Sequence, residues 1–470
     1  MKKLRPLLLA VPLLLPQWAA AAEFDASRLS PAWGIPFAGI LLSIALMPLL
    51  APSFWHHHFG KVAAAWALAF LLPFAAFFGV STAGAALVHT LLAEYIPFVI
   101  LLTALFTVSG GIYIRGNLHG SPQLNTAILG IGAFLASFMG TTGASMLLIR
   151  PLIRANDNRK HQAHTVVFFI FIVSNAGGSL TPLGDPPLFL GFLKGVDFFW
   201  TIRWIFPETL FLVGALLLIF YALDWWYYHK REEVKPLDPT PDTRGVGFDG
   251  ARNFWLLAAI VGLVLLSGFW KTDAGFNVAG TPVGLPGLVR DLGLVAVTVL
   301  SLRITPARVH EANQFSWGPM QEVAKLFAGI FLTIIPVIAM LRAGLDGPFA
   351  PIVAAVTRAD GTPDPAAYFW AAGALSSFLD NAPTYLVFFN TAGGDPQVLM
   401  TTLAPVLAAI SAGAVFMGAN TYIGNAPNLM VKSIAEDRGV RMPSFFGYMA
   451  WSGAILVPLF IVMTFVWFRP

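Results

Sequence analysis

The sequence predicts an all-α polytopic membrane protein built from two inverted-topology repeats, and two observations support that prediction. Hydrophobic residues make up 57% of the chain and charged residues only 11%, whereas soluble domains carry roughly 25% charged residues. The pattern Gly-x-x-Thr-x-x-Gly-x-x-Pro occurs at 178–187 and, 240 residues later, at 418–427. We therefore expect each repeat to contain about five transmembrane helices, one of them broken, and one re-entrant hairpin.

Residues 1–22 are typical of a secretory signal peptide. Lys2, Lys3 and Arg5 precede an apolar stretch, and small residues at 19–22 form a cleavage site. The alternative is an uncleaved first transmembrane helix.

Six apolar segments then follow in each half of the chain. The first membrane repeat, residues 23–227, has segments near 34–51, 62–80, 91–109, 122–153, 163–190 and 204–223. The second, residues 253–470, has segments near 253–271, 287–304, 322–341, 366–390, 400–428 and 447–467. Residues 228–252 between them are polar and contain several prolines, and we interpret them as a cytoplasmic linker.

The fourth segment of each half is interrupted by polar residues. The first is broken around Thr141 and Thr142, and the second around Asp380 and Asn381, just after Ser377. Because each arm is too short to cross a bilayer comfortably at 1.5 Å per residue, we predict two re-entrant hairpins with polar tips. Irregular backbone at that depth is tolerated only where it lines a cavity or is buried in protein.

This arrangement gives five crossings per half, and an odd number inverts the second half relative to the first. Lys and Arg then concentrate in the predicted cytoplasmic loops, as expected for a multi-pass protein. We therefore predict a bacterial inner-membrane protein whose mature N-terminus and C-terminus both lie in the periplasm.

Asp380 is the sharpest candidate for a functional residue. A carboxylate at this depth is costly and usually marks an ion or proton pathway. Burial favours the protonated form of such a group and a bound cation favours the ionised form, so one carboxylate can exchange a proton for a cation. The alternative interpretation is a helix N-cap, which Asp before Asn-Ala-Pro also suits.

The fifth segment of each half is interrupted by the repeated Gly/Thr/Gly/Pro pattern, and these two breaks supply further oxygen ligands. Asp185 lies in the first copy, although Asp-Pro-Pro is also a good helix start. The neighbouring candidates offer amide, hydroxyl and backbone oxygens, which suit a hard cation such as Na⁺; they are Asn175, Thr181, Thr421 and Asn425. The helix starts at these breaks could instead receive a carboxylate substrate.

Other polar residues have plainer interpretations. We expect Glu94 to be interfacial, and Glu208 and Asp224 to lie at the boundary of the sixth segment. The His56-His57-His58 tract makes a poor chelating face, so we predict an interfacial belt and cytoplasmic loop there. A solvated loop is likewise expected around His161 and His164.

Several function classes are excluded by what the sequence lacks. The chain has no cysteine, which excludes disulfides and thiolate metal sites, and it has no Gly-Lys-Ser/Thr phosphate loop for ATP coupling. The net charge of +4 is consistent with basic cytoplasmic loops and does not point to nucleic acid. We therefore expect no enzyme activity and no cofactor other than the transported Na⁺ and H⁺.

The motifs at 174–187, 377–384 and 418–428 resemble those of the ion transporter superfamily, which includes NhaD-type sodium/proton antiporters, arsenite permeases and sodium-coupled citrate and dicarboxylate carriers. The resemblance implies two hairpins, two broken helices, an elevator-like or rocking movement and a homodimer. Carboxylate-carrying members hold their substrate with Ser-Asn-Thr motifs, which this chain lacks at its tips. The resemblance to the antiporter branch assigns the cation and proton to Asp380, Asn381 and Asp185.

These observations favour a secondary active transporter that exchanges Na⁺ for H⁺ on mid-membrane carboxylates. The first alternative is Na⁺- or H⁺-coupled transport of citrate or another small carboxylate, and the second is an arsenite or other oxyanion permease. The remaining expected partner is membrane lipid.

Overall fold

The computed structural model describes residues 29–230 and 239–469. It confirms an all-α polytopic membrane protein: within these residues seven helices are long and apolar enough to cross a membrane, or eight if one bent pair is a single span. The predicted signal peptide lies outside the described residues, as does part of the predicted linker.

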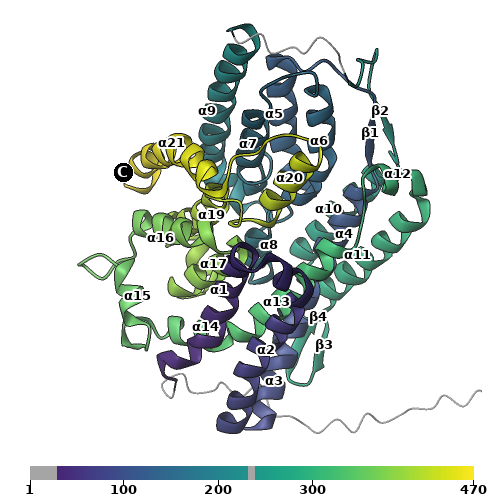
Figure 1. Cartoon of the computed structure of the whole chain (residues 1–470). Helices are drawn as coiled ribbons and strands as arrows, with labels where there is room; N and C mark the ends of the chain where they lie inside the picture. Colours follow the sequence, from purple (N-terminus) through teal and green to yellow (C-terminus); the bar gives the residue numbers. More distant parts are fainter. Residues whose placement is uncertain (1–28, 231–238, 470) are drawn as a thin grey trace, which may run out of the picture.

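The helices of the first half, and those of the second half, succeed one another with little other structure between them (Figure 1). The first half contains α1 (Ile35–Leu50), α2 (Pro52–Phe78), α3 (Val80–Thr90), η3 (Leu91–Tyr95), α4 (Ile96–Gly110), α5 (Pro122–Met139), α6 (Thr141–Ala155), α7 (Ala163–Ile172), η4 (Ala176–Ser179), α8 (Pro186–Leu193) and α9 (Trp200–Lys230). The second half contains α10 (Asn253–Phe269), α11 (Leu285–Ile304), α12 (Ala307–Ala312), α13 (Gly318–Thr333), α14 (Ile335–Arg342), α15 (Ala350–Ala355), α16 (Pro365–Phe378), α17 (Asn381–Thr391), α18 (Pro396–Met400), α19 (Ala404–Met417), η6 (Gly418–Asn420), α20 (Ala426–Asp437), α21 (Phe445–Met463) and η7 (Thr464–Phe468).

The helical elements that surround the predicted tips and breaks recur in the same order in both halves. α5 and α6 meet at Gly140, and α16 and α17 are separated only by residues 379–380. α7 and α8 flank an irregular stretch, as α19 and α20 do in the second half. That the two halves are inverted relative to each other, and that the α5–α6 and α16–α17 pairs re-enter the membrane, stay predictions.

The four helices of the α5–α6 and α16–α17 pairs differ in length. α6, α16 and α17 have 15, 14 and 11 residues, or about 17 to 22 Å at 1.5 Å per residue. α5 has 18 residues and is long and apolar enough to be counted among the candidate spans. The expectation that every arm is too short is therefore wrong for α5.

The segment predicted near 322–341 is not one straight helix. It consists of α13 and α14, which bend by 43° at a short break. Pro336 lies at the start of α14, and its missing N–H and its ring disfavour continuation of the preceding helix.

The His56-His57-His58 tract lies in helix rather than in a loop, which corrects the prediction for these residues. α2 begins at Pro52 and runs through the tract into the second apolar segment. Proline at the first helical position favours a helix start here. All three side chains are at least partly exposed, and they do not converge on a common point.

The sheet content is limited to two short antiparallel pairs. β1 (Tyr113–Arg115) pairs with β2 (Gly247–Asp249), and β3 (Gly275–Val278) pairs with β4 (Thr281–Gly284). The β1–β2 pair attaches the end of the predicted linker to the first half.

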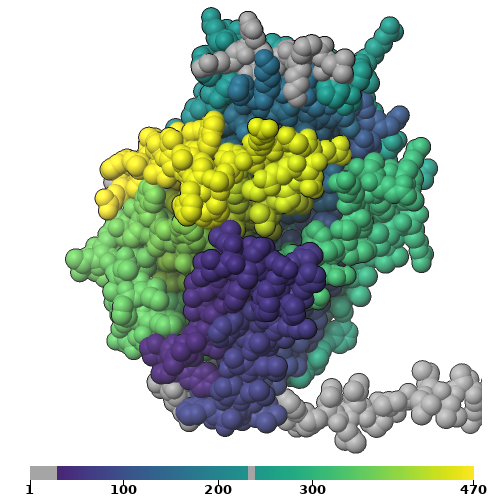
Figure 2. All heavy atoms as spheres, in the orientation of Figure 1, coloured from purple at the N-terminus to yellow at the C-terminus, as the bar shows by residue number. Residues whose placement is uncertain are grey.

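One cluster of buried apolar side chains runs through both halves. Large apolar residues are also exposed on the outer helices, among them Leu72, Trp255 and Phe446, as expected where helices face lipid. On the face shown in Figure 2, the surface is formed by segments from both halves of the chain.

Candidate functional site

The two irregular stretches after α7 and α19 have glycines where the backbone folds back on itself. A Cβ on Gly184 would lie 2.1 Å from the carbonyl oxygen of Gly178, and one on Gly424 would lie 2.5 Å from that of Gly418. Real side chains essentially never approach this closely. The second glycine of the repeated pattern is therefore required to let each break close on itself.

The threonine of the repeated pattern makes the same contact in both halves. Thr181 donates a hydrogen bond to the carbonyl of Ser137, and Thr421 donates one to the carbonyl of Ser377. The two serines in turn donate to carbonyls of the break, at Gly177 and Met417. These bonds attach each break to the last turn of α5 or α16.

Asp185 lies where the two halves meet. It directly precedes α8, but its side chain makes no capping hydrogen bond to that helix. Its Oδ1 accepts from Thr141 Oγ1 at 3.0 Å and from Asn425 Nδ2 at 3.3 Å, while its Oδ2 accepts from Asn381 Nδ2. The carboxylate is 1% exposed and receives donors from α6, from α17 and from the residue that precedes α20.

Asp380 has a different environment. It is the N-cap residue of α17, and its Oδ1 accepts from the backbone N–H of Ala382 at 3.0 Å. Its side chain is only partly buried. The helix-cap interpretation therefore describes the local geometry of Asp380, although the neighbouring Asn381 connects it to Asp185.

Three asparagines connect the breaks of the two halves. Asn425 donates to Asn175 Oδ1 at 3.3 Å, and Asn175 donates to Asn428 Oδ1 at 2.7 Å. Asn428 also donates to the carbonyls of Gly418 and Thr421. Asn428 is not among the predicted site residues. Its position three residues after Asn425, on the first turn of α20, indicates that its side chain can reach the same break.

The predicted site residues therefore fall into two groups. Thr141, Asn381 and Asn425 contact Asp185, and Asn175 contacts Asn425. The other five do not bind Asp185: Asp380 caps α17, Thr181 and Thr421 bind main-chain carbonyls, Ser377 binds Gly373, Met417 and Asn420, and Thr142 makes no side-chain hydrogen bond within the described residues.

The titratable side chains of the site are two acids, Asp185 and Asp380. Within the described residues neither Asp185 nor Asp380 forms an ion pair with Lys, Arg or His, and the Oδ1 atom of Asn381 is buried without a hydrogen-bond partner. Carboxylate, carbonyl and hydroxyl oxygens are ligands that hard cations prefer. The described residues contain no group of three or more His, Cys, Asp or Glu that could hold a resident metal.

The prediction of a solvated loop for His164 is wrong, because His164 lies in α7 and is buried. The boundary position of Asp224 stays a prediction, but its side chain is 0% exposed and binds both Arg159 and His164 at 2.7 Å. Asn125 donates to its other oxygen at 2.9 Å. Buried charges need such partners, and the seven-residue loop after α6 brings Arg159 inward to supply one, whereas His161 is exposed.

Glu94 and Glu208 are also buried within the protein, and their predicted positions at a membrane boundary stay predictions. Glu94 forms an ion pair with Lys194, which follows α8. Glu208 is 4% exposed and lies well inside α9.

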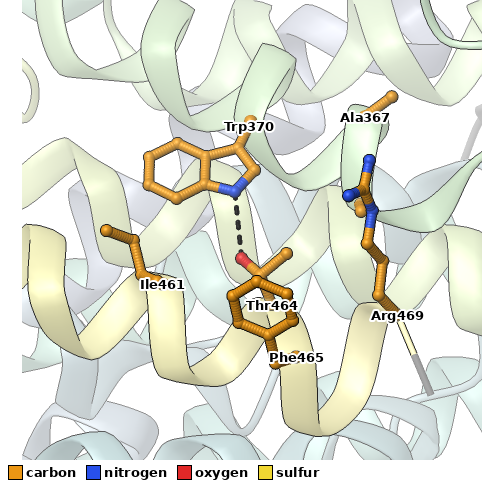
Figure 3. Close-up of a pocket in the computed structure, with 7 residues that line it drawn as sticks. Ala367, Trp370, Ile461, Thr464, Phe465 and Arg469 are labelled. Atoms are coloured by element: carbon orange, nitrogen blue, oxygen red, sulfur yellow. Dashed lines mark hydrogen bonds between the residues drawn. The ribbon is translucent and has the colours of Figure 1, made fainter.

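A cavity of about 290 Å³ lies away from this site, near the end of the chain. Figure 3 shows Trp370 donating from its indole Nε1 to Thr464 Oγ1 across this cavity, with Arg469 at its side. Its lining is largely apolar, so it does not provide a second cluster of cation ligands.

A family model described as "Putative citrate transport" matches residues 26–468. No curated protein matches the chain.

Proposed function

The chain belongs to the "Putative citrate transport" family, and from that premise we propose that it is a secondary active transporter that exchanges Na⁺ for H⁺. Membership of this family together with several apolar spanning helices makes it a multi-pass membrane transporter. The exchange of these two ions is the finer proposal, and the environment of Asp185 carries it.

The carboxylate of Asp185 is buried among neutral donors with no basic partner in the described residues. An ionised carboxylate in this position is costly unless a cation or proton neutralises it. Na⁺ would bind the carboxylate oxygens together with the free oxygen of Asn381, and the hydroxyl of Thr141 would turn its lone pairs to the ion. Protonation of Asp185 would remove the main ligand charge and release the ion.

Competition for one site is enough to enforce exchange. The transporter then needs to switch the side of the membrane to which the site opens only when the carboxylate is neutralised, by either Na⁺ or H⁺. The ion that moves down its gradient then drives the other ion against its own. In this scheme Asp380 adds a second negative charge next to Asn381, whereas Asn425 and Asn175 position the cluster. Thr181 and Thr421 hold the breaks in shape.

Cation-coupled transport of citrate or another small carboxylate is the second candidate, and the description of the family favours it. The N-termini of α6 and α17 meet near Asp185 and could attract an anion. Against this candidate stands the negative charge of both acids, which would repel a carboxylate substrate unless bound cations neutralised them first.

Purified protein in liposomes that contain a pH-sensitive dye tests both candidates. After a proton gradient is imposed, Na⁺, Li⁺, K⁺ or citrate is added separately. We expect Na⁺ alone to dissipate the proton gradient in liposomes with the wild type. In liposomes with Asp185→Asn or Asp380→Asn, we expect Na⁺ to leave the gradient intact. Asn is as good an N-cap as Asp, so Asp380→Asn removes the charge and keeps the helix start.

Asp395→Asn is the matched control, because Asp395 is an exposed N-cap of α18 that accepts hydrogen bonds from Gln397 and Val398 and from none of the site residues. Exchange that persists in Asp185→Asn would contradict the proposal. A response only to citrate plus Na⁺ would select the carboxylate transporter instead.

A further inference from the structure

Glu208 occupies an inward-facing position of α9 where an apolar residue would be expected. The buried stripe of this helix contains Thr201, Ile205, Glu208 and Leu212 at helical spacing. Glu208 lies eight residues after the start of α9, about 12 Å along its axis. α9 is long and apolar enough to cross a membrane, so Glu208 lies within a candidate membrane-spanning helix.

No charged group within the described residues neutralises this carboxylate. Glu208 forms no ion pair, and its Oε2 atom is buried without a hydrogen-bond partner. The elements packed most extensively against α9 are α5, α7, η4 and α19, and among the described residues their only titratable side chain is His164, which binds Asp224 four turns further along α9. α18 and η7 also touch α9, through Met400 on Trp200 and Trp467 on Phe211, and neither element contains a titratable side chain. Arg203 lies on the exposed face of α9.

The energetic consequence is that Glu208 is stable here only in its neutral form. A lone ionised carboxylate in a low-dielectric interior costs several kcal/mol, and nothing on the neighbouring helices offsets that cost. This distinguishes it from Asp224 and Glu94, which are also buried but each have a cationic partner.

α9 is attached directly to the first break beside Glu208. Thr209 forms a hydroxyl–hydroxyl hydrogen bond with Ser179 of η4 at 2.7 Å, and Thr201 donates to the carbonyl of Leu180 at 2.7 Å. Thr181 follows immediately, and through Ser137 it holds the end of α5. A charge that appeared on Glu208 would therefore act on the segment that shapes the cation site.

We infer that Glu208 is a second proton-binding residue of the transport cycle, distinct from Asp185 and coupled to the first break through Thr209 and Ser179. The inference rests on the proposed function in requiring proton-coupled transport, but it does not depend on which solute is exchanged for the proton. The proton forms an O–H bond with one carboxylate oxygen of Glu208, and its release leaves the carboxylate ionised.

Infrared spectroscopy of the purified protein tests where the proton resides without any transport. We expect a C=O band of a protonated carboxyl group that shifts in D₂O and that Glu208→Gln removes. Glu94→Gln is the matched control and should leave this band unchanged, because Glu94 is paired with Lys194. A band that survives Glu208→Gln would overturn the inference.

Transport in liposomes tests the coupling. We expect Glu208→Gln to keep cation binding but to move the pH of half-maximal transport by about one unit, a tenfold change in apparent proton affinity. Thr209→Val should retain the infrared band and still shift the pH profile. An unchanged pH profile in Glu208→Gln would overturn the role of Glu208 in the cycle, even if the band were lost.

The two proposals fail in different ways. Absence of proton movement in the wild type with every solute would contradict the proposed function, while the infrared measurement would still assign or deny the proton to Glu208. Na⁺-driven proton movement with identical spectra and profiles in the wild type and Glu208→Gln would contradict only the inference about Glu208.

Discussion

At the scale of single residues, carboxamides form most of the connections between the two halves. An amide is uncharged and both donates and accepts, so a chain of asparagines can satisfy buried polar atoms without adding charge to a membrane interior. Asn428 is the most heavily used of them, because it bonds to Asn175 and to two carbonyls of the second break.

Replacing Asn428 with Ala should therefore destabilise the site. The change removes three hydrogen bonds and takes this donor from the carbonyls of Gly418 and Thr421, whereas Asn175 still donates to Ile170. An unsatisfied buried polar group costs about 1–3 kcal/mol, so we expect a lower unfolding temperature and weaker cation binding. Thermal unfolding in detergent with and without Na⁺ measures both effects. Gln397→Ala, at an exposed amide, should change neither; equal behaviour of the two variants would contradict the role of Asn428.

Also at the scale of single residues, the surroundings of a buried carboxylate decide how much it contributes to stability. Asp224 lies in a cluster with Arg159, His164 and Asn125, and removal of one partner from a buried ion pair leaves the other uncompensated.

We expect Asp224→Ala to lower the free energy of unfolding by about 3–5 kcal/mol. Lys432→Ala removes one partner of the partly exposed Lys432–Glu436 pair and should cost no more than about 1 kcal/mol. Unfolding followed by tryptophan fluorescence would compare the two, and similar losses would show that the buried cluster contributes little.

At the scale of elements, the breaks after α7 and α19 decide the architecture of the site. Each closes through a contact between two glycines of the repeated pattern and is attached to the preceding helix pair by one threonine. Helices that stop and restart in this way direct their ends at a common point, which continuous helices cannot do.

A single methyl group should disrupt this arrangement. Gly184→Ala or Gly424→Ala places a Cβ against a backbone carbonyl that has no room to move, so we expect poor expression or loss of transport. Gly214→Ala is the matched control, since nothing lies within 4 Å of a Cβ there and Ala favours helix over Gly by about 1 kcal/mol. Normal transport by Gly184→Ala would show that the break can relax.

At the scale of the whole molecule, the ion pair between Glu94 and Lys194 joins η3 to the end of α8. η3 is a π-helical turn, and such turns often occur at functional positions. α8 begins directly after Asp185, so a movement of α8 away from η3 would break this pair.

The absence of cysteine from the native chain makes this movement testable. We expect a Glu94→Cys, Lys194→Cys double variant to lose transport when a short bifunctional thiol reagent bridges the two positions. The reagent should have no effect on either single variant, because no second thiol is available. Full transport in the bridged protein would show that these two segments stay together throughout the cycle.

The prediction from sequence was most successful where the cause is local. Apolar length indicates which segments can cross a bilayer, and glycine, proline and polar residues indicate where a helix is interrupted. The breaks and tips at 140–143, 178–187, 380–383 and 418–427 were placed on this basis, and all of them interrupt helices in the structure. The bend at Pro336 was missed although its cause is equally local.

The sequence by itself determined the membrane class, the succession of helices and the places where they break, because these depend on neighbours within a few residues. Only the tertiary structure decided which acid has which environment: Asp185 at the centre, Asp224 paired and Glu208 alone. The reason is distance along the chain, since the donors to Asp185 lie 44, 196 and 240 residues away from it. Contacts of that range are set by the packing of whole helices, which local pattern does not determine.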